Sequence, residues 1–233
     1  MLSGEDFKNG QVLLIDKPLE WTSFQAVNKL RWAIRKTFKI KKIKVGHAGT
    51  LDPLATGLLV ICTGKMTKQI NTFQGQEKEY TGTITLGSTT PSYDLETEID
   101  QTYPIDHITE TLIHEATEKF IGEIEQYPPV FSAVKKDGKR LYEFARAGQE
   151  VEIKPRNIEI KAFEITAIDN LNLKFRVVCS KGTYIRSLAH DFGKTLNSGA
   201  HLTELRRTRI GDFKIEGAIS PEEFIETLHK DAP

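Results

Sequence analysis

The sequence GHAGTLDPLATG at residues 46–57 is the most informative stretch of this 233-residue chain. Three glycines and a proline in twelve residues are too many for a regular helix or strand, so we predict a loop. Asp52 stands between Leu51 and Pro53, and Pro53 favours an extended backbone at Asp52. The glycines allow another segment or a ligand to approach the backbone closely. The loop thus displays a carboxylate that can be a nucleophile, a base, or only an acceptor in an Asx turn.

Apolar patterns on either side of this loop predict both strands and helices. Continuous or alternating apolar residues predict strands at 11–16, 58–62, 79–86, 158–168 and 171–179, the last two joined by a turn at Asp169-Asn170. Helical spacing predicts helices at 109–121, 184–196 and 221–229, and loop, turn and a short helix at 127–150. Another helix begins at a Thr22 or Ser23 cap and carries Phe24, Val27, Leu30 and Ile34 on its apolar face. Because the order shows no βαβ rhythm, we expect an α+β fold.

The composition is that of a folded protein without membrane or secretory segments. A hydrophobic share of 39% with 27% charged residues excludes a largely disordered chain. No apolar run approaches the roughly 18–20 residues that a membrane span needs, and the first residues do not resemble a secretory signal. Cys62 and Cys179 lie far apart and in no CxxC motif. This cysteine usage excludes a disulfide framework and predicts a cytoplasmic location.

Charge is sorted along the chain although the totals, 32 basic and 32 acidic residues, cancel. Residues 29–44 hold eight cations and no acid, whereas residues 94–126 hold ten acids and one cation. Smaller basic clusters lie at 135–140, 181–186 and 206–209, and aromatic residues lie among the cations: Trp32, Phe38, Tyr142 and Tyr184. This combination suits a phosphate backbone with stacked bases. A solvated helix face explains residues 29–44 equally well.

Motifs for nucleotide and metal cofactors are absent. Gly64-Lys65 suggests a phosphate loop, but Leu59 and Met66 occupy the positions where that motif needs glycine and a hydroxyl residue. The six histidines show no metal-ligand spacing. We therefore expect no cofactor and no metal site.

Extended by two residues, the loop sequence GHAGTLDPLATGLL closely resembles the signature loop of the bacterial tRNA pseudouridine-55 synthases. Five further blocks resemble motifs of that family and occur in the family's order: Asp16-Lys17-Pro18 with Trp21-Thr22-Ser23, Lys78-Glu79-Tyr80, and residues 128–148, 181–191 and 201–211. Together the blocks cover about residues 11–213. One block could arise by chance, but six in register could not.

The resemblance implies an isomerase that makes pseudouridine at position 55 of tRNA without a cofactor. The reaction breaks the uridine N–C glycosidic bond, rotates the base and rejoins it through C5. Asp52 matches the essential aspartate, and attack on the ribose, a glycal intermediate and attack on the uracil ring all stay open. Arg186 matches the partner arginine, whose guanidinium can pair with Asp52. Tyr80 matches the active-site tyrosine, expected to stack on the target base.

The resemblance also implies residues that bind the substrate. Tyr184 and Leu205 match residues that line the uracil pocket, although either could equally be a core residue. Because the target base must flip out of the T-loop, His47 is expected to fill the vacated space or to hold the flipped nucleotide. Lys17 is expected to brace the loop of Asp52 or to meet a phosphate.

The family's organisation gives expectations for the whole chain. It implies the pseudouridine synthase fold, a mixed and mostly antiparallel sheet flanked by helices and loops, with a central active-site cleft. We expect one catalytic domain over residues 1–233, with an RNA-gripping insertion at about 127–150 that holds the T-loop and stem of tRNA together with residues 29–44. Phe131 stands where many relatives have tyrosine. Larger relatives continue into a C-terminal RNA-binding domain, for which we expect no room here.

Two other functions compete with this interpretation. One is a non-catalytic RNA-binding protein on the same fold, but the presence of Asp52, Tyr80 and Arg186 together favours an enzyme. The other is modification of a different uridine, as in the eukaryotic and archaeal relatives that work with guide RNA. Because the longer chains and docking regions of those relatives are absent, we expect a stand-alone monomer with no guide RNA and no membrane partner.

Overall fold

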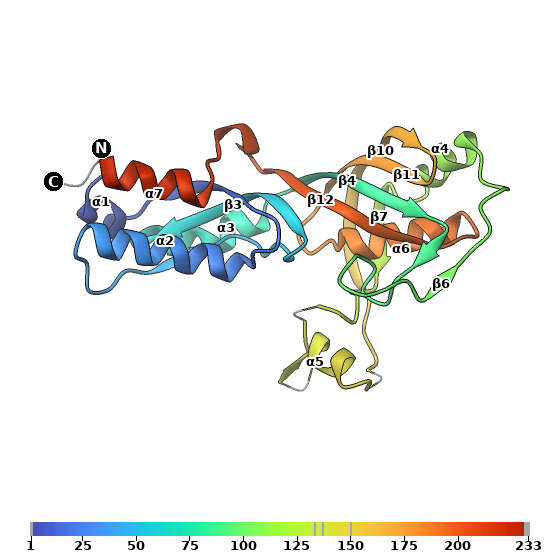
Figure 1. The fold of residues 1–233 in the computed structure, drawn as a ribbon, viewed down its shortest axis with the longest axis horizontal. Coiled ribbons are helices and arrows are strands. Elements are labelled where there is room, and N and C mark those ends of the chain that lie inside the picture. The colour runs from blue at the N-terminus through green and yellow to red at the C-terminus, as the bar shows by residue number, and fades with distance from the viewer. Residues whose placement is uncertain (1, 133, 137, 150, 231–233) are drawn as a thin grey trace. The chain divides into compact units, whose positions relative to one another are not determined.

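The computed structural model describes residues 2–132, 134–136, 138–149 and 151–230, which form two units. The first unit comprises Met1–Tyr80 with Arg206–Pro233, and the second comprises Thr81–Leu205. Strands β4 (Lys78–Leu86) and β12 (Ala200–Ile210) carry the chain from one unit to the other, so each strand contributes residues to both (Figure 1). Each unit combines helices with an antiparallel sheet, which confirms the α+β prediction.

The sheet of the first unit is built around β3 (Ala55–Thr63). Strand β1 (Val12–Lys17) runs antiparallel to β3, with Lys17 opposite Gly57. Strand β2 (Val45–His47) pairs with the end of β3, and β12 is a further neighbour that turns back into β13 (Phe213–Lys214). The loop that carries Asp52 therefore connects two strands of this sheet.

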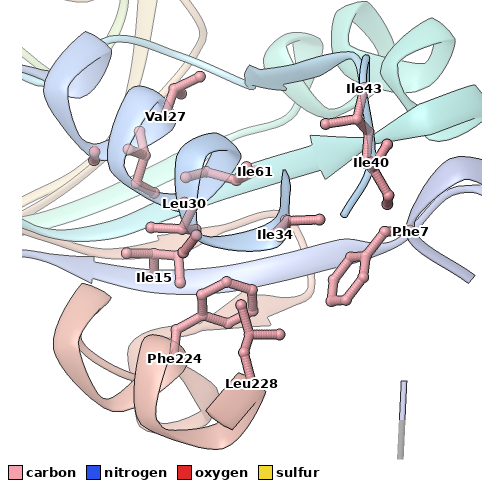
Figure 2. Close-up of a cluster of buried hydrophobic side chains, with 13 residues drawn as sticks. Phe7, Ile15, Val27, Leu30, Ile34, Ile40, Ile43, Ile61, Phe224 and Leu228 are labelled. Carbon is pink, nitrogen blue, oxygen red and sulfur yellow. The ribbon is translucent and has the colours of Figure 1, made fainter. Parts of the chain in front are cut away.

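Helices cover both faces of β3. Because successive side chains of a strand point to opposite faces, neighbouring residues of β3 pack against different helices. Leu59 and Ile61 belong to a core with α1 (Gly4–Asn9), α2 (Ser23–Thr37) and α7 (Pro221–Lys230). Figure 2 shows Leu30 and Ile34 of α2 directed toward β1 and α7 in this core. Leu58 and Val60 pack instead with residues of α3 (Ile70–Gly75), which follows the 3₁₀ helix η1 (Gly64–Gln69). Burial on both faces explains the uninterrupted apolar run at residues 58–62.

The start of α2 agrees with the predicted cap, but one residue of its apolar face is misplaced. The Thr22 hydroxyl accepts a hydrogen bond from the backbone of Gln25 at 3.1 Å, and the Gln25 side chain accepts one from the backbone of Thr22. Val27 and its helical neighbours one and two turns on are buried, as predicted. The prediction is wrong for Phe24, which is 66% exposed, because the position lies on the outward side of the first turn.

The second unit contains the remaining sheet and two main helices. Strand β10 (Arg156–Asp169) pairs antiparallel with β11 (Asn172–Cys179) and, on its other side, with β7 (Gly122–Gln126). The predicted hairpin turn is confirmed, with Asn170 at a φ of 51°. Helices α4 (Glu110–Glu118) and α6 (Ile185–Thr195) contribute to a core with edge-to-face contacts of Phe163 with Phe120 and Phe192. Strands β5 (Ser88–Thr89) and β6 (Gln101–Thr102) form a separate ribbon.

The predicted insertion at 127–150 contains short elements within the second unit. They are β8 (Lys135–Lys136), β9 (Lys139–Arg140) and α5 (Leu141–Arg146), in agreement with the prediction of loop, turn and short helix. Ala133, Asp137 and Glu150 of this segment lie outside the described residues. The RNA-gripping role, the single-domain organisation and the central cleft stay predictions.

Two other predictions need correction. The loop covers only residues 48–54, because its outer glycines lie in β2 and β3. The helix predicted at 109–121 ends at Glu118, with Leu112 41% exposed. Strand β12 was not predicted, because its C-terminal half alternates charged and polar residues without an apolar face.

Candidate functional site

Asp52 is half-buried in the loop at 48–54, between the buried Leu51 and the exposed Pro53. Its carbonyl oxygen accepts a hydrogen bond from the N–H of Ala55 at 3.1 Å, which closes the turn into β3. The N–H of Ala48, at the other end of the loop, donates to the carbonyl of Val60 at 2.9 Å. Both ends of the loop are therefore tied to β3.

Arg207 fixes the half of the loop that precedes Asp52. It lies on β12 and is 1% exposed. Its Nη2 donates to the carbonyl of Gly49 at 3.0 Å, its Nη1 to that of Thr50 at 3.5 Å, and its Nε to that of Leu58 at 2.8 Å. A planar guanidinium can satisfy three carbonyls in this way, whereas an ammonium group cannot reproduce its geometry.

Glycine at position 57 permits this arrangement. Gly57 has a φ of 101°, and a Cβ there would lie 2.3 Å from the backbone oxygen of Arg207. Only glycine fits both the backbone angle and the space. The close approach that the sequence predicts at a glycine of residues 46–57 is thus made at Gly57 by another segment of the same unit.

Ser23 fixes the residue immediately before Asp52. The buried Ser23 hydroxyl accepts a hydrogen bond from the N–H of Leu51 at 2.8 Å and donates one to the carbonyl of Leu51 at 3.1 Å. Because Ser23 is the first residue of α2, the capped end of that helix sets the position of the loop backbone.

Lys17 fixes the residue immediately after Asp52. The carbonyl of Pro53 accepts from the Lys17 ammonium at 3.4 Å and from the N–H of Glu20 at 2.8 Å. The buried ammonium also donates to the carbonyls of Pro18 at 2.8 Å and Trp21 at 2.5 Å. Burial lowers the pKa of Lys17 to about 8, and the negative charge of Asp52 opposes part of this shift. These contacts match the bracing role expected of Lys17; its contact with substrate stays a prediction.

His47 ends β2, five residues before Asp52. Burial is the main cause that lowers the pKa of His47, and the positive charge of Arg207 lowers it further. The ring is therefore neutral at pH 7 and can offer one donor and one acceptor nitrogen. Its contact with a flipped nucleotide stays a prediction.

Tyr80 is buried near the start of β4. It belongs to the first unit, whose N-terminal part ends at this residue. The first unit thus holds four of the predicted site residues: Lys17, His47, Asp52 and Tyr80. The second unit holds the other three: Tyr184, Arg186 and Leu205.

Arg186 is buried near the start of α6 and has a carboxylate partner within its own unit. Its Nε lies 3.5 Å from Oδ2 of Asp94, and its Nη1 donates to the carbonyl of Ser92 at 3.2 Å. Between these partners, Tyr93 stacks on His190, one turn after Arg186 on α6, with ring centroids 3.8 Å apart. Segment 92–94 therefore packs against α6 and fixes the side chain of Arg186. The predicted pairing of Arg186 with Asp52 stays a prediction.

Tyr184 and Leu205 are both half-buried. Tyr184 caps α6, and its backbone exchanges two hydrogen bonds with the side-chain amide of Gln126, at 2.8 and 3.0 Å. Their roles in a uracil pocket stay predictions.

The basic segments differ in exposure. In residues 29–44, seven of the eight cations are exposed and Arg31 is half-buried. Phe38 packs on Phe7 with ring centroids 5.6 Å apart and is half-buried, so part of its ring belongs to the core; its role in stacking stays a prediction. The cluster at 206–209 is not a free basic surface, because Arg206 pairs with Asp16 at 2.6 Å and Arg209 with Glu77 at 2.6 Å, while Arg207 is buried.

Three residues of the site escaped the sequence reasoning: Ser23, Asp94 and Arg207. The sequence indicates Ser23 only as a helix cap and as part of the block Trp21-Thr22-Ser23, and Asp94 only as part of an acidic stretch. Arg207 was counted among surface cations. A strand prediction for 200–210 would have placed Arg207 on the face opposite to Arg206, because side chains alternate. Within the part of the chain that the structure describes, no group of three His, Cys, Asp or Glu could hold a metal ion.

Comparison with known families gives two matches that together cover most of the chain. A family model described as "TruB family pseudouridylate synthase (N terminal domain)" matches residues 35–185. A second, described as "tRNA pseudouridylate synthase B C-terminal domain", matches residues 186–232.

Curated relatives and solved structures agree with these matches. A protein of Flavobacterium johnsoniae named tRNA pseudouridine synthase B is 64% identical over 97% of this chain and 100% of its own length. One of Phocaeicola vulgatus with the same name is 59% identical over 96% of this chain and 95% of its own length. A chain in the crystal structure of a Cbf5–Nop10–Gar1 complex is 30% identical, with a TM-score of 0.71. The alignment covers 97% of this chain but only 58% of that one.

Proposed function

The chain belongs to the TruB family of pseudouridylate synthases, which are isomerases, and from this premise we propose that it converts uridine 55 in the T-loop of tRNA to pseudouridine. The observation that carries the proposal is the loop at 48–54. Buried groups from three other segments hold the backbone on both sides of Asp52, which is half-exposed as a residue. A carboxylate held in this way suits nucleophilic or base catalysis, because its position is set before substrate arrives.

The proposed reaction is an internal transfer that needs no oxidant, reductant or energy source. The bond between uracil N1 and ribose C1′ breaks, the base rotates, and a bond from C5 to C1′ replaces it. C5 loses a proton and N1 gains one, so substrate and product are isomers. Asp52 supports the cleavage as nucleophile or base, and Tyr80 stacks on the base during its rotation.

Arg186 is proposed as the partner of the Asp52 carboxylate. Its contacts with Asp94 and with the carbonyl of Ser92 support this role, because they limit the rotamers of a long side chain within the second unit.

The basic residues of segments 29–44 and 135–146 are proposed to hold the T-loop and stem of tRNA. Most cations of the first segment are exposed, and a folded RNA is generally held through its backbone and shape. His47, Tyr184 and Leu205 are proposed to contact the flipped nucleotide, and its flipping is required because the target atom lies within the folded loop.

We further propose that the enzyme acts as a monomer in the cytoplasm, without guide RNA. Cys62 and Cys179 are buried and not disulfide-bonded, which suits a reducing compartment. No described helix combines the length and apolar character needed to cross a membrane. The relatives that match over their whole length carry the name of a tRNA enzyme, whereas the Cbf5 complex contains a longer chain.

Incubation of the purified chain with unmodified tRNA transcript tests the function. Carbodiimide treatment followed by primer extension should show one new stop, immediately 3′ of position 55, without any added RNA or cofactor. A transcript with cytidine at position 55 is the matched control and should show no stop. Modification of another uridine, or none at all, would contradict the proposal, and activity only with an added guide would assign the guide-dependent alternative.

A further inference from the structure

The outward face of α2 carries side chains that a helix exposed only to water does not need. Phe24 is 66% exposed and Trp32 is 56% exposed, on a helix whose other large apolar residues are buried. Eight positions form this face, and they comprise two aromatics, two amides and four cations: Phe24, Gln25, Asn28, Lys29, Arg31, Trp32, Arg35 and Lys36. The face contains no acid.

Only part of the charge on this face serves the stability of the helix, because Arg35 and Lys36 lie in the last turn, where cations are favourable, whereas Lys29 and Arg31 do not. Solvated helices are stabilised by opposite charges spaced three or four residues apart, and by acids in the first turn. Here Arg31 and Arg35, four residues apart, repel each other, and the first turn carries no acid. Among the described residues, no acid forms an ion pair with any of the four cations. The composition therefore fits a negatively charged partner better than water.

The aromatic residues narrow the kind of partner. The ammonium of Lys36 lies over the Trp32 ring, 4.7 Å from its centre, so a cation is held on one face of an exposed aromatic ring. Such a pair matches a phosphate next to a base or sugar face, because each base can stack on an indole while cations bind the backbone.

The position of this face connects it with the proposed active site of the first unit. Ser23, which precedes Phe24, binds the backbone of Leu51 directly. From Phe24 to Lys36 the helix runs about 18 Å, at 1.5 Å per residue. A polyanion that reaches Asp52 can therefore continue along α2.

We propose that the outward face of α2, residues 24–36, is an RNA-docking surface on which Trp32 and Phe24 stack against unpaired bases or riboses of the tRNA substrate. The inference rests on the proposed function and extends it. The cations of residues 29–44 would bind phosphates without help from aromatic residues, whereas the proposal adds stacking by two aromatic side chains. The cations of the same face neutralise the adjoining phosphates.

Binding of unmodified tRNA transcript to four proteins tests the proposal: the parent, Phe24→Ala, Trp32→Ala and Leu112→Ala. Leu112 is the matched control, since it is an exposed apolar residue on α4, a helix without cations. Loss of one base–aromatic stack should weaken binding by about fivefold or more for Trp32→Ala. Leu112→Ala should bind as the parent does. Parental affinity of both aromatic variants would overturn the proposal.

Fluorescence gives a second readout that does not depend on removing Trp32. The chain has two tryptophans, so Trp21→Phe leaves Trp32 as the single reporter. Its emission should be quenched by tRNA, and unchanged emission at saturation would contradict stacking.

Sedimentation shows whether a second copy of the chain covers this face instead: a parental dimer that Trp32→Ala dissociates would overturn the proposal. Inactivity of the parent would refute the proposed function, whereas unchanged affinities in an active parent would refute only the role of α2.

Discussion

The hydroxyl of Ser23 makes two hydrogen bonds with the backbone of Leu51, accepting at 2.8 Å and donating at 3.1 Å. One side chain at the start of α2 thereby sets the peptide units next to Asp52. With Arg207 on the preceding residues and Lys17 on the following one, the loop is held over five consecutive residues, 49–53. We predict that loss of these contacts lowers the rate of pseudouridine formation as well as the free energy of unfolding.

Ser23→Ala removes both hydrogen bonds to Leu51 and leaves a buried N–H and carbonyl unpaired. The free energy of unfolding should fall by about 1–3 kcal/mol, and the single-turnover rate should fall more than tRNA affinity. Ser220→Ala is the matched control, because Ser220 binds the N–H of Glu223 at 3.1 Å at the start of α7 and is expected to cost about 1 kcal/mol. Equal rates for the two variants would mean that Ser23 serves stability alone.

Arg207→Lys keeps the buried charge but cannot span the carbonyls of Gly49, Thr50 and Leu58. At least one carbonyl loses its donor, so unfolding should become easier by about 2 kcal/mol, as denaturant titration can measure. The rate at saturating tRNA should fall as well. Arg206→Lys, at the neighbouring half-exposed residue, should change stability by less than about 1 kcal/mol. A parental rate for Arg207→Lys would refute the positioning role.

Lys17 predicts a pH dependence of stability. Its pKa of about 8 in the folded protein lies below the ordinary value of 10.5, so between these pH values the unfolded chain binds a proton that the folded chain has released. Stability from this group should therefore rise with pH above about 8, by at most about 1.4 kcal/mol per pH unit, and stay constant below. The measurement is the difference in unfolding free energy between the parent and Lys17→Met from pH 7 to 10. A difference independent of pH would contradict the shifted pKa.

The exposed lysines after α2 predict the salt dependence of tRNA binding. Replacing Lys41, Lys42 and Lys44 together by alanine should weaken binding and flatten the plot of log affinity against log salt, by roughly 0.7–0.9 for each lost phosphate contact. The step at saturating tRNA should stay parental. A triple variant of three exposed lysines elsewhere in the same unit, Lys8, Lys65 and Lys68, controls for the change in net charge. Identical slopes for the two triple variants would mean that the cluster is only a solvated surface.

Local patterns predicted most of the fold, and the failures have physical reasons. The run at 58–62 predicted β3 because burial on both faces leaves no polar position. The residues around Arg206 and Arg209 do not predict strand β12, because charged and polar residues follow one another there without an apolar face; in the structure, acids pair with both arginines. Phe24 was misplaced because helical spacing cannot separate a core residue from an exposed one at the margin of the apolar face.

The residues of the candidate site also fall into those that the sequence indicates and those that it does not. The motif around Asp52 could be found because its residues are consecutive. The groups that hold this loop could not, since Ser23 lies 28 residues from Leu51 and Arg207 lies 158 residues from Gly49. Nor could Asp94, 92 residues before Arg186, be singled out among the ten acids of 94–126 by spacing alone. Such partners depend on the tertiary fold, which periodicity does not encode.

The most direct test of the account is the single-turnover rate of pseudouridine formation by Asp52→Asn, with tRNA affinity measured on the same protein. The amide keeps the volume of the side chain but removes its ability to act as nucleophile or base. The account predicts parental affinity, parental stability and no detectable product. A rate above about one hundredth of the parent's at saturating enzyme would contradict the assignment of Asp52 as the catalytic residue.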